Sequence, residues 1–494
     1  MSVGMVNEQS GEGDPVQGGT LTFGSYSSIT TLDPSKTPVA GSVGGTELGA
    51  IYDSLLRYDP LGEEFVPKLA ESMSPNSDFK TWILKLREGV TFSDGSPFDS
   101  QAVKWSLDRY VSNQGPQSSL YSSRVASVDT PDASTVVFHL TDPWTGIQTM
   151  LATGPGMIVA PSSESSEQFS PIGAGAFALE KFAPYEELVL AARPDYYAGK
   201  PNLERLRIVS LPGSDTTVDS LVTGGLDVAH VRASDTLIPD LIDQGYPGFL
   251  DLPSLSAQSQ INMAPGRPGA DIRVRQALAL AVDPEALDLR INDGNGLPGQ
   301  EIFQESSRWH NDVGPIGFDP AKAKELLDEA KSDGYDGKIS LVSTQDPVGQ
   351  NLALALQSML NAVGFDFQIK YANSVADVVK TIFADRDFDL AGGALNLPDA
   401  DPFERLYGTL KTGSQSNASG YSDAEMDSLL DKLGAATTDH EKKAVLAQIQ
   451  ERVNETVPWQ TYGVVPILNV WGKNVHGVQQ SMDGIMLFDS TWKG

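Results

Sequence analysis

The alternation of strand and helix patterns between residues 318 and 371 constrains the fold most. A helix is predicted over 318–330, because Asp319 suits an N-cap and Pro320 suits the first helical position. Its buried stripe is predicted to be Ala323, Leu326, Leu327 and Ala330. Strands are predicted over 338–344 and 365–371, with a helix over 350–363 between them. This β-α-β order predicts an α/β lobe.

Length and charge set the next limits. A chain of 494 residues is too long for one hydrophobic core, so we expect two or three packing units. The formal net charge of −30 disfavours binding to nucleic acid and to an anionic membrane face. The same net charge also favours solubility, and it gives no information about the charges inside a binding cleft.

The residue types needed for common catalytic and metal chemistry are scarce. The chain has no cysteine, which excludes disulfides, thiolate zinc sites, iron–sulfur clusters and cysteine nucleophiles. None of its five histidines forms an HExxH motif, and no G-x-S-x-G elbow is present. The glycine-rich segments 41–45 and 153–156 lack the ending of a phosphate loop. We therefore predict no enzyme activity, no cofactor and no metal.

Further elements follow from local patterns. We expect a strand near 20–23, a helix over 41–58, a strand over 82–87, a helix starting at Ser100 and a hairpin over 128–140 with its turn at 131–132. One amphipathic helix is predicted over 272–287 with Asp271 as its N-cap. Capping boxes are predicted at Ser422 with Glu425 and at Thr438 with Glu441. Residues 458–472 are expected to be extended.

Two blocks of the chain carry a recognisable pattern of fixed spacings. In the first block, residues 52–109, the matching positions are Leu69, Ala70, Ser72, Trp82, Leu86, Arg87, Gly89, Val90, Phe92, Asp94, Gly95, Pro97, Val103, Ser106 and Arg109. In the second block, residues 171–229, they are Gly173, Gly175, Phe177, Tyr197, Gly199, Pro201, Leu203, Leu221, Gly225, Asp227 and Ala229. The second block departs from the pattern at Ala174 and Ala176, each of which replaces another small residue.

These blocks resemble family 5 of the bacterial extracellular solute-binding proteins, which serve peptide and nickel ABC importers. The resemblance runs from Gly18 to about Val478. It implies a two-lobed α/β periplasmic-binding-protein fold of type II, with a hinge of two crossing segments near Leu252 and Gln460 and a ligand enclosed between the lobes. Lobe I would comprise residues 18–252 and 462–494, with an extra subdomain inserted at about 58–165, and lobe II residues 253–461.

The first 17 residues leave two alternatives for the location of the protein. They contain no basic start and no apolar segment, so they are not a signal peptide. Either the protein is cytosolic, or the sequence is that of a mature form from which an export segment and a lipid-bearing cysteine have been removed. The resemblance favours the second alternative, in which residues 1–17 are a flexible tether and the protein is a periplasmic or cell-surface lipoprotein.

One segment departs from the pattern expected for a peptide receptor. Peptide-binding relatives carry an aspartate that pairs with the α-ammonium of the ligand, in a segment ending in Asp/Glu-Pro. When that segment is aligned on Asp401 and Pro402, Pro398 stands at the aspartate position. Asp399 is displaced by one residue and is a candidate replacement, or else both aspartates cap the turn before a helix at Phe403.

Other candidate ligand residues come from their positions near expected strand ends. In the first lobe they are Ser25, Tyr26, His230 and Arg232. In the rest of the chain they are Asn396, Asp399, Tyr421 and Tyr462. His230 is the strongest candidate, because a neutral imidazole both donates and accepts hydrogen bonds. Arg232 suits a ligand carboxylate.

We therefore predict an extracytoplasmic receptor that captures a peptide or a similar small polar solute and delivers it to an ABC permease. The expected partners are this ligand and the permease subunits, with no nucleic acid, and the protein is expected to be a monomer. Two alternatives stay open. One is a hydrolase acting on peptides or amides, and the other is a chemosensory receptor of the same fold with a non-peptide ligand.

Overall fold

The computed structural model describes residues 2–7, 13–164, 168–211, 213–233 and 235–494. The chain divides into two compact units. Unit 1 comprises Met1–Ala233, Leu237–Asp251 and Pro466–Gly494, and unit 2 comprises Leu252–Val465 with Ser234–Thr236. Each unit is built around its own mixed sheet with helices packed on it, as expected for an α/β chain.

The main sheet of unit 1 has eight strands in the order β1-β13-β20-β12-β2-β11-β10-β9. Their bounds are β1 Gly4–Val6, β2 Thr20–Ser25, β9 Phe177–Ala183, β10 Glu187–Ala192, β11 Arg205–Ser210, β12 Val228–Arg232, β13 Gly248–Asp251 and β20 Ile467–Trp471. β11, β2 and β12 run parallel to one another, and β12 pairs antiparallel with β20. The core of unit 1 lies against these strands, with Leu21, Phe23 and Ile208 fully buried.

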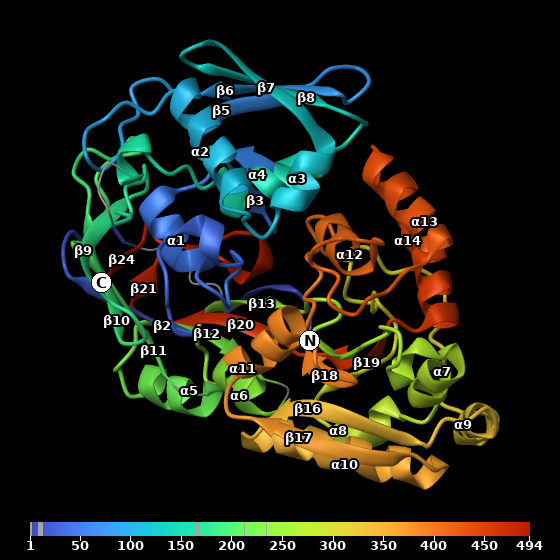
Figure 1. Ribbon diagram of the computed structural model, residues 1–494. Helices are drawn as coiled ribbons and strands as arrows, with labels where there is room; N and C mark the ends of the chain where they lie inside the picture. The colour runs from blue at the N-terminus through green and yellow to red at the C-terminus, as the bar shows by residue number, and fades with distance from the viewer. Residues whose placement is uncertain (1, 8–12, 165–167, 212, 234) are drawn as a thin grey trace. The chain divides into compact units, whose positions relative to one another are not determined.

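A smaller sheet and one helix that packs on it contain much of the first sequence block of unit 1. The small sheet has the order β5-β6-β8-β7, with β5 Ala70–Pro75, β6 Thr81–Leu86, β7 Val125–Asp132 and β8 Thr135–Leu140. α2 (Ser100–Ser112) packs on it, as Figure 1 shows at the top of the molecule. Arg109 of α2 makes two hydrogen bonds to the buried Asp33 carboxylate, at 2.7 and 3.0 Å. This pair ties α2 to the short 3-10 helix Pro34–Lys36, which Asp33 caps.

The remaining elements of unit 1 are short. The helices are α1 Gly45–Tyr52, α3 Ser118–Arg124, α4 Ile147–Leu151, α5 Ser214–Val222 and α6 Leu237–Asp243. The strands are β3 Leu56–Asp59, β4 Glu64–Pro67, β21 Val475–His476, β22 Gln479–Gln480, β23 Met486–Leu487 and β24 Trp492–Lys493.

The sheet of unit 2 has six strands in the order β15-β19-β14-β18-β16-β17. Their bounds are β14 Ala257–Ile261, β15 Leu297–Pro298, β16 Lys338–Thr344, β17 Asp366–Ala372, β18 Leu390–Gly393 and β19 Trp459–Val464. The helices are α7 Ile272–Leu280, α8 Pro284–Ile291, α9 Pro320–Ser332, α10 Pro347–Val363, α11 Val375–Lys380, α12 Phe403–Leu410, α13 Ala424–Ala435 and α14 Asp439–Thr456. α10 packs along β16 and β17, which are parallel neighbours (Figure 1).

Strong local signals were predicted correctly. Asp319 caps α9 through Lys322 N, and the four residues of the predicted stripe are buried. The capping box at Thr438 and Glu441 starts α14. The strands expected over 338–344 and 365–371 are β16 and, within one residue at each end, β17.

Four local predictions were wrong, each for a physical reason. The helix expected over 272–287 is broken in two, because Pro284 disfavours helix at the residue before it and Asp283 caps the new helix α8. The helix expected over 41–58 ends at Tyr52, because Asp53 adopts φ +56°. α13 is capped by Asp423 rather than Ser422. The turn of the β7–β8 hairpin lies after Asp132, and Pro131 is tolerated in β7 because that strand is at the sheet edge.

The expected tether contains a strand. β1 pairs antiparallel with β13, so Gly4–Val6 closes one edge of the main sheet of unit 1. The outer edge of β13 would otherwise present unpaired backbone N–H and C=O groups, and β1 forms hydrogen bonds to part of it. The described part of the chain does not include residues 1 and 8–12 of the expected tether. It also does not include residue 165, at the end of the expected subdomain.

We predict that breaking the buried ion pair between Asp401 and Lys442 destabilises unit 2 far more than breaking a surface pair does. Asp401 Oδ2 lies 2.8 Å from Lys442 Nζ, and both side chains are nearly buried. The substitution Asp401→Asn leaves the Lys442 charge buried without its partner, which costs about 3 kcal/mol or more. The matched variant Asp328→Asn removes the exposed pair with Lys324 and is expected to cost under about 0.5 kcal/mol. Urea unfolding of both variants measures the difference, and equal midpoints would contradict the prediction.

Candidate functional site

The carboxyl ends of the parallel strands in unit 1 meet at one edge of the sheet, where ligands of open α/β sheets commonly bind. β2 ends at Ser25 and β12 ends at Arg232. Ala229 is paired with Gly24, which puts His230 level with Ser25. All four candidate residues of the first lobe therefore lie at this edge, which we call the unit 1 binding edge: Ser25, Tyr26, His230 and Arg232.

His230 lies inside β12 rather than after it, and it is buried. Its Nδ1 lies 2.8 Å from Asn469 Oδ1 on the opposite strand β20. The amide nitrogen of Asn469 donates to Gln480 Oε1 and to the Gly484 carbonyl, so its oxygen has to face the imidazole and accept. Nδ1 therefore carries the hydrogen and Nε2 is a bare acceptor. Nε2 has no hydrogen-bond partner among the residues that the structure describes.

Burial also determines the charge of His230. Loss of solvation lowers the pKa of His230 from 6.5 to about 4, although the hydrogen bond that its Nδ1 donates to Asn469 acts in the opposite direction. The imidazole is therefore neutral at neutral pH. Arg232 acts in the same direction as burial, because its positive charge disfavours a second cation nearby.

Tyr26 and Ser25 form the turn that follows β2. The Ser25 side chain is fully buried, and its hydroxyl donates to the Ser27 carbonyl at 3.0 Å. The Tyr26 side chain is 42% exposed, and its ring meets the His230 ring edge-on at 6.0 Å between centroids. Tyr26 is thus the member of the unit 1 binding edge that joins buried His230 to the surface.

Glu47 is a further polar residue at this edge, and the sequence analysis did not single it out. It lies in the first turn of α1, which begins after Gly44 with φ +71°. Glu47 is fully buried, and neither carboxylate oxygen has a hydrogen-bond partner in the described part of the chain. Burial raises the pKa of Glu47 to about 6, and the nearby Ser25 hydroxyl acts in the opposite direction. A signal was present in the sequence, because Glu47 is the single charged residue in the stretch GTELGAIY.

In unit 2, the candidate residues near 396–401 lie in a loop that follows β18. This loop is held by backbone hydrogen bonds from Leu395 N to the Leu255 carbonyl at 2.9 Å and from Leu397 N to the Ser254 carbonyl at 2.8 Å. Asn396 between them adopts φ +48°. Its side-chain oxygen is buried without a hydrogen-bond partner among the described residues. A residue in the left-handed region with an unsatisfied polar atom is typical of a functional position.

Asp399 is bound within unit 2. Its carboxylate accepts hydrogen bonds from the Ser307 hydroxyl at 2.6 Å and from Arg308 N at 3.3 Å, and its carbonyl accepts one from Trp309 Nε1 at 2.9 Å. Asp401 accepts from Phe403 N at 2.9 Å, in agreement with a cap before α12. These contacts give both carboxylates roles in positioning the loop, and the role of Asp399 in ligand binding stays a prediction.

The two tyrosine candidates of unit 2 are buried. Thr456 donates its hydroxyl hydrogen to the Arg452 carbonyl, so the Tyr421 hydroxyl is the donor in its 3.0 Å bond to Thr456 Oγ1. The Tyr462 hydroxyl donates to Ser259 Oγ at 2.8 Å. Burial raises the pKa of Tyr421 to about 12 and that of Tyr462 further, so both stay neutral at neutral pH.

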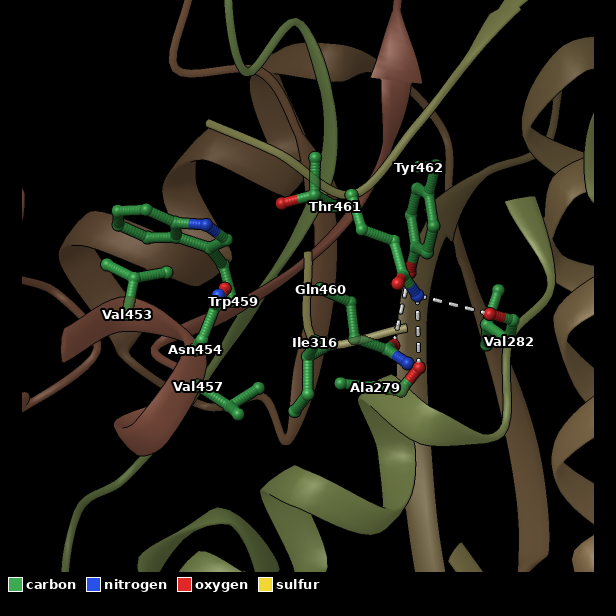
Figure 2. A pocket seen from close by; sticks show the side chains of 11 residues that line it. Ala279, Val282, Ile316, Val453, Asn454, Val457, Trp459, Gln460, Thr461 and Tyr462 are labelled. Carbon is green, nitrogen blue, oxygen red and sulfur yellow. Dashed lines mark hydrogen bonds between the residues drawn. The ribbon is translucent and has the colours of Figure 1, made fainter. Parts of the chain in front are cut away.

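Tyr462 also lines a small pocket of unit 2, shown in Figure 2. Its cavity volume is about 20 Å³, which is room for a water molecule or two and not for a peptide. Trp459 and Gln460 from the same strand line it. Gln460 Nε2 donates to the Leu278 carbonyl at 2.6 Å, whereas Trp459 Nε1 has no partner among the described residues.

The comparisons with known proteins decide the family. The model of bacterial extracellular solute-binding proteins, family 5 Middle, matches residues 64–417. The chain belongs to this family. Family 5 proteins are extracellular solute-binding proteins of transporters, so the predicted family, the type II fold and the solute-binding function are confirmed. In the described part of the chain, no helix combines the length and the apolar character that a membrane span needs.

Individual relatives agree with this assignment to family 5. One relative is named "Probable D,D-dipeptide-binding periplasmic protein DdpA" of Escherichia coli K12, and it is 27% identical over 443 residues, which cover 86% of this chain and 84% of the relative. The oligopeptide-binding protein AppA from Bacillus subtilis, solved with a nonapeptide, superposes with a TM-score of 0.83 at 21% identity and covers 97% of this chain and 100% of its own. AgaA from A. tumefaciens R10, solved with agropinic acid, gives a TM-score of 0.81 at 24% identity, over 96% of this chain and 99% of its own.

We predict that His230 makes the protein lose stability in mild acid. The unfolded chain takes up a proton on this histidine near pH 6.5, whereas the folded protein takes it up near pH 4. The contribution to the free energy of unfolding is therefore complete above pH 6.5 and is lost as the pH falls to about 4, by about 3 kcal/mol. The variant His230→Asn keeps an N–H donor toward Asn469 but does not titrate, so this loss disappears from its stability curve.

The matched control is His440→Asn, since His440 is exposed on α14. Urea unfolding at several pH values between 4 and 7.5 gives the curves for the three proteins. Glu47 has a raised pKa and acts in the opposite direction, because the folded protein holds a proton that the unfolded chain releases between pH 4.5 and about 6. That effect, about 2 kcal/mol, is common to all three proteins and cancels in the differences. Parallel curves for wild type and His230→Asn would contradict the prediction.

Proposed function

We propose that this protein captures peptides outside the cytoplasm and delivers them to the membrane subunits of an ABC importer. The observation that carries the proposal is the match to the solute-binding family over residues 64–417, together with a relative named for dipeptide binding that aligns over most of both chains. Solute binding is the function of the family, and the peptide is the finer step that we propose.

The positions of the polar residues support a receptor of this kind. Ser25, Tyr26, His230 and Arg232 belong to unit 1, and Asn396, Asp399, Tyr421 and Tyr462 belong to unit 2. A ligand that binds one conformation of the protein more tightly than another shifts the population toward it, and a permease can select that conformation. Apart from the short segment 234–236, the chain crosses between the units at Asp251–Leu252 and at Val465–Pro466, and we propose these two crossings as the hinge.

We propose further that the protein binds its ligand without chemical change. A serine hydrolase needs its hydroxyl hydrogen-bonded to a base, but the Ser25 hydroxyl donates to the Ser27 carbonyl instead. We also propose that the protein acts as a monomer and that a lipid anchor holds it at the extracytoplasmic face of a membrane. Both points extend beyond the family assignment.

Identification of co-purifying ligand tests the peptide proposal. Native mass spectrometry of the purified protein, followed by denaturing release, is expected to show a mixture of peptides. The refolded, ligand-free protein is then expected to be stabilised by a peptide library by about 3 kcal/mol when the peptide is at 100 times its Kd. Free amino acids at the same total concentration are the control and are expected to give no shift. A single non-peptide species, or a protein that no peptide stabilises, would overturn the proposal.

A further inference from the structure

Two buried acceptors at the unit 1 binding edge lack donors. Both oxygens of Glu47 and the Nε2 atom of His230 are without hydrogen-bond partners among the described residues. Buried polar groups in native proteins nearly always have partners, so each exception needs an explanation. Two such exceptions at one edge indicate that the missing partner comes from outside the chain.

Two consecutive residues at the end of β2 contact the two acceptors. Ser25 lies beside Glu47, and the next residue, Tyr26, contacts His230 edge-on. The segment before and within β23 packs against His230 and hydrogen-bonds to Thr46, the residue before Glu47. Gly484 packs so close to His230 that an added Cβ would lie 3.0 Å from the imidazole, and Met486 N donates to the Thr46 hydroxyl at 3.1 Å, next to Glu47.

The chemistry of the missing partner follows from these groups. A carboxylate and a neutral imidazole nitrogen both accept hydrogen bonds, so their partner has to donate several. Burial is the main influence on the pKa of Glu47, and among the described residues no cationic side chain opposes it. Hence the partner also has to supply the positive charge that a buried carboxylate requires.

An ammonium group meets both requirements, because it carries three donors and one positive charge. A resident metal ion fits less well, since no group of three or more His, Asp or Glu side chains suited to a metal occurs in the described part of the chain. The exposed Tyr26 ring adds an aromatic face of the kind that attracts organic cations.

We propose that Glu47 binds the α-ammonium group of the peptide ligand, with His230 Nε2 as a second acceptor and Tyr26 covering the group. This inference rests on the proposed peptide function and specifies which end of the peptide unit 1 recognises. Because Glu47 and His230 are buried, the ammonium group has to enter past the turn formed by Ser25 and Tyr26.

Calorimetric titration of the ligand-free protein with matched probes tests this assignment. The probes are di-, tri- and penta-alanine, each with a free N-terminus and as the N-acetyl derivative, at pH 7.5. Wild type is expected to bind the free form about 100-fold more tightly than the acetylated form, because acetylation removes the charge that Glu47 pairs with. In Glu47→Gln the free form weakens by about that factor and the two forms bind equally.

The matched control is Glu71→Gln, since Glu71 is exposed on β5 of the same unit. This control is expected to retain the preference of wild type. If Glu47→Gln does not fold, Glu47→Asp serves instead, because it keeps the charge and withdraws it by one methylene. It is expected to prefer the free form but to bind it about 10-fold more weakly than wild type.

The outcomes separate the two proposals. Tight binding of free and acetylated probes alike by wild type would overturn the ammonium site and leave the peptide function standing. An undiminished preference for the free form in Glu47→Gln would do the same. If no probe of either form binds and no peptide co-purifies, the peptide function fails, and the ammonium site fails with it.

Discussion

The pairing of β12 with β20 is the interaction on which the unit 1 binding edge depends. β20 comes near the end of the chain, yet it lies between β12 and β13 in the sheet. The pairing sets His230 opposite Asn469, and this register supplies the acceptor that fixes the imidazole tautomer. Without β20, His230 would lose its partner and β12 would present an open strand edge. Unit 1 therefore cannot form its binding edge before the C-terminal segment has been made.

Desolvation explains the electrostatics of that edge. It raises the pKa of Glu47 and lowers that of His230, so both groups are driven toward their neutral forms. Among the described residues, neither this acid nor this base has an oppositely charged side chain beside it. Apolar residues at these positions would avoid the cost of burial. A ligand that carries the missing charge gives a reason for keeping the polar residues.

Sequence reasoning succeeded where the signal is local. Asp319 with Pro320, and Thr438 with Glu441, start their helices because a cap depends on neighbours within one turn. It failed at 272–287, where the apolar periodicity continues across Pro284 and masks the break. The strands β16 and β17 were predictable from their residue patterns. Their parallel pairing, with α10 as the connection between them, follows from the general preference for β-α-β units and not from any single residue.

The candidate site was harder to predict because it depends on distant contacts. Position after a strand led to His230, but its partner Asn469 lies on a strand that sequence order separates from it. Glu47 was missed because a single carboxylate in an apolar helix looks like an exposed residue until its burial is known. Asp399 attracted attention through its place in a motif, yet the folded chain supplies it with donors from Ser307 and Arg308. Glu47 and Asp399 therefore differ in whether described residues donate hydrogen bonds to their carboxylates, and the sequence does not show this difference.

The contrast between bulk charge and one buried carboxylate bears on how such a receptor selects its ligands. The net charge of −30 is spread over a solvated surface, where salt screens it within about 8 Å. Glu47 is buried away from water, so its interaction with a cation is much stronger than the interaction within an ion pair on the surface. Every unmodified peptide carries the α-ammonium whatever its side chains are. An anchor for that group therefore gives affinity without demanding a sequence, which suits a receptor that has to accept many peptides.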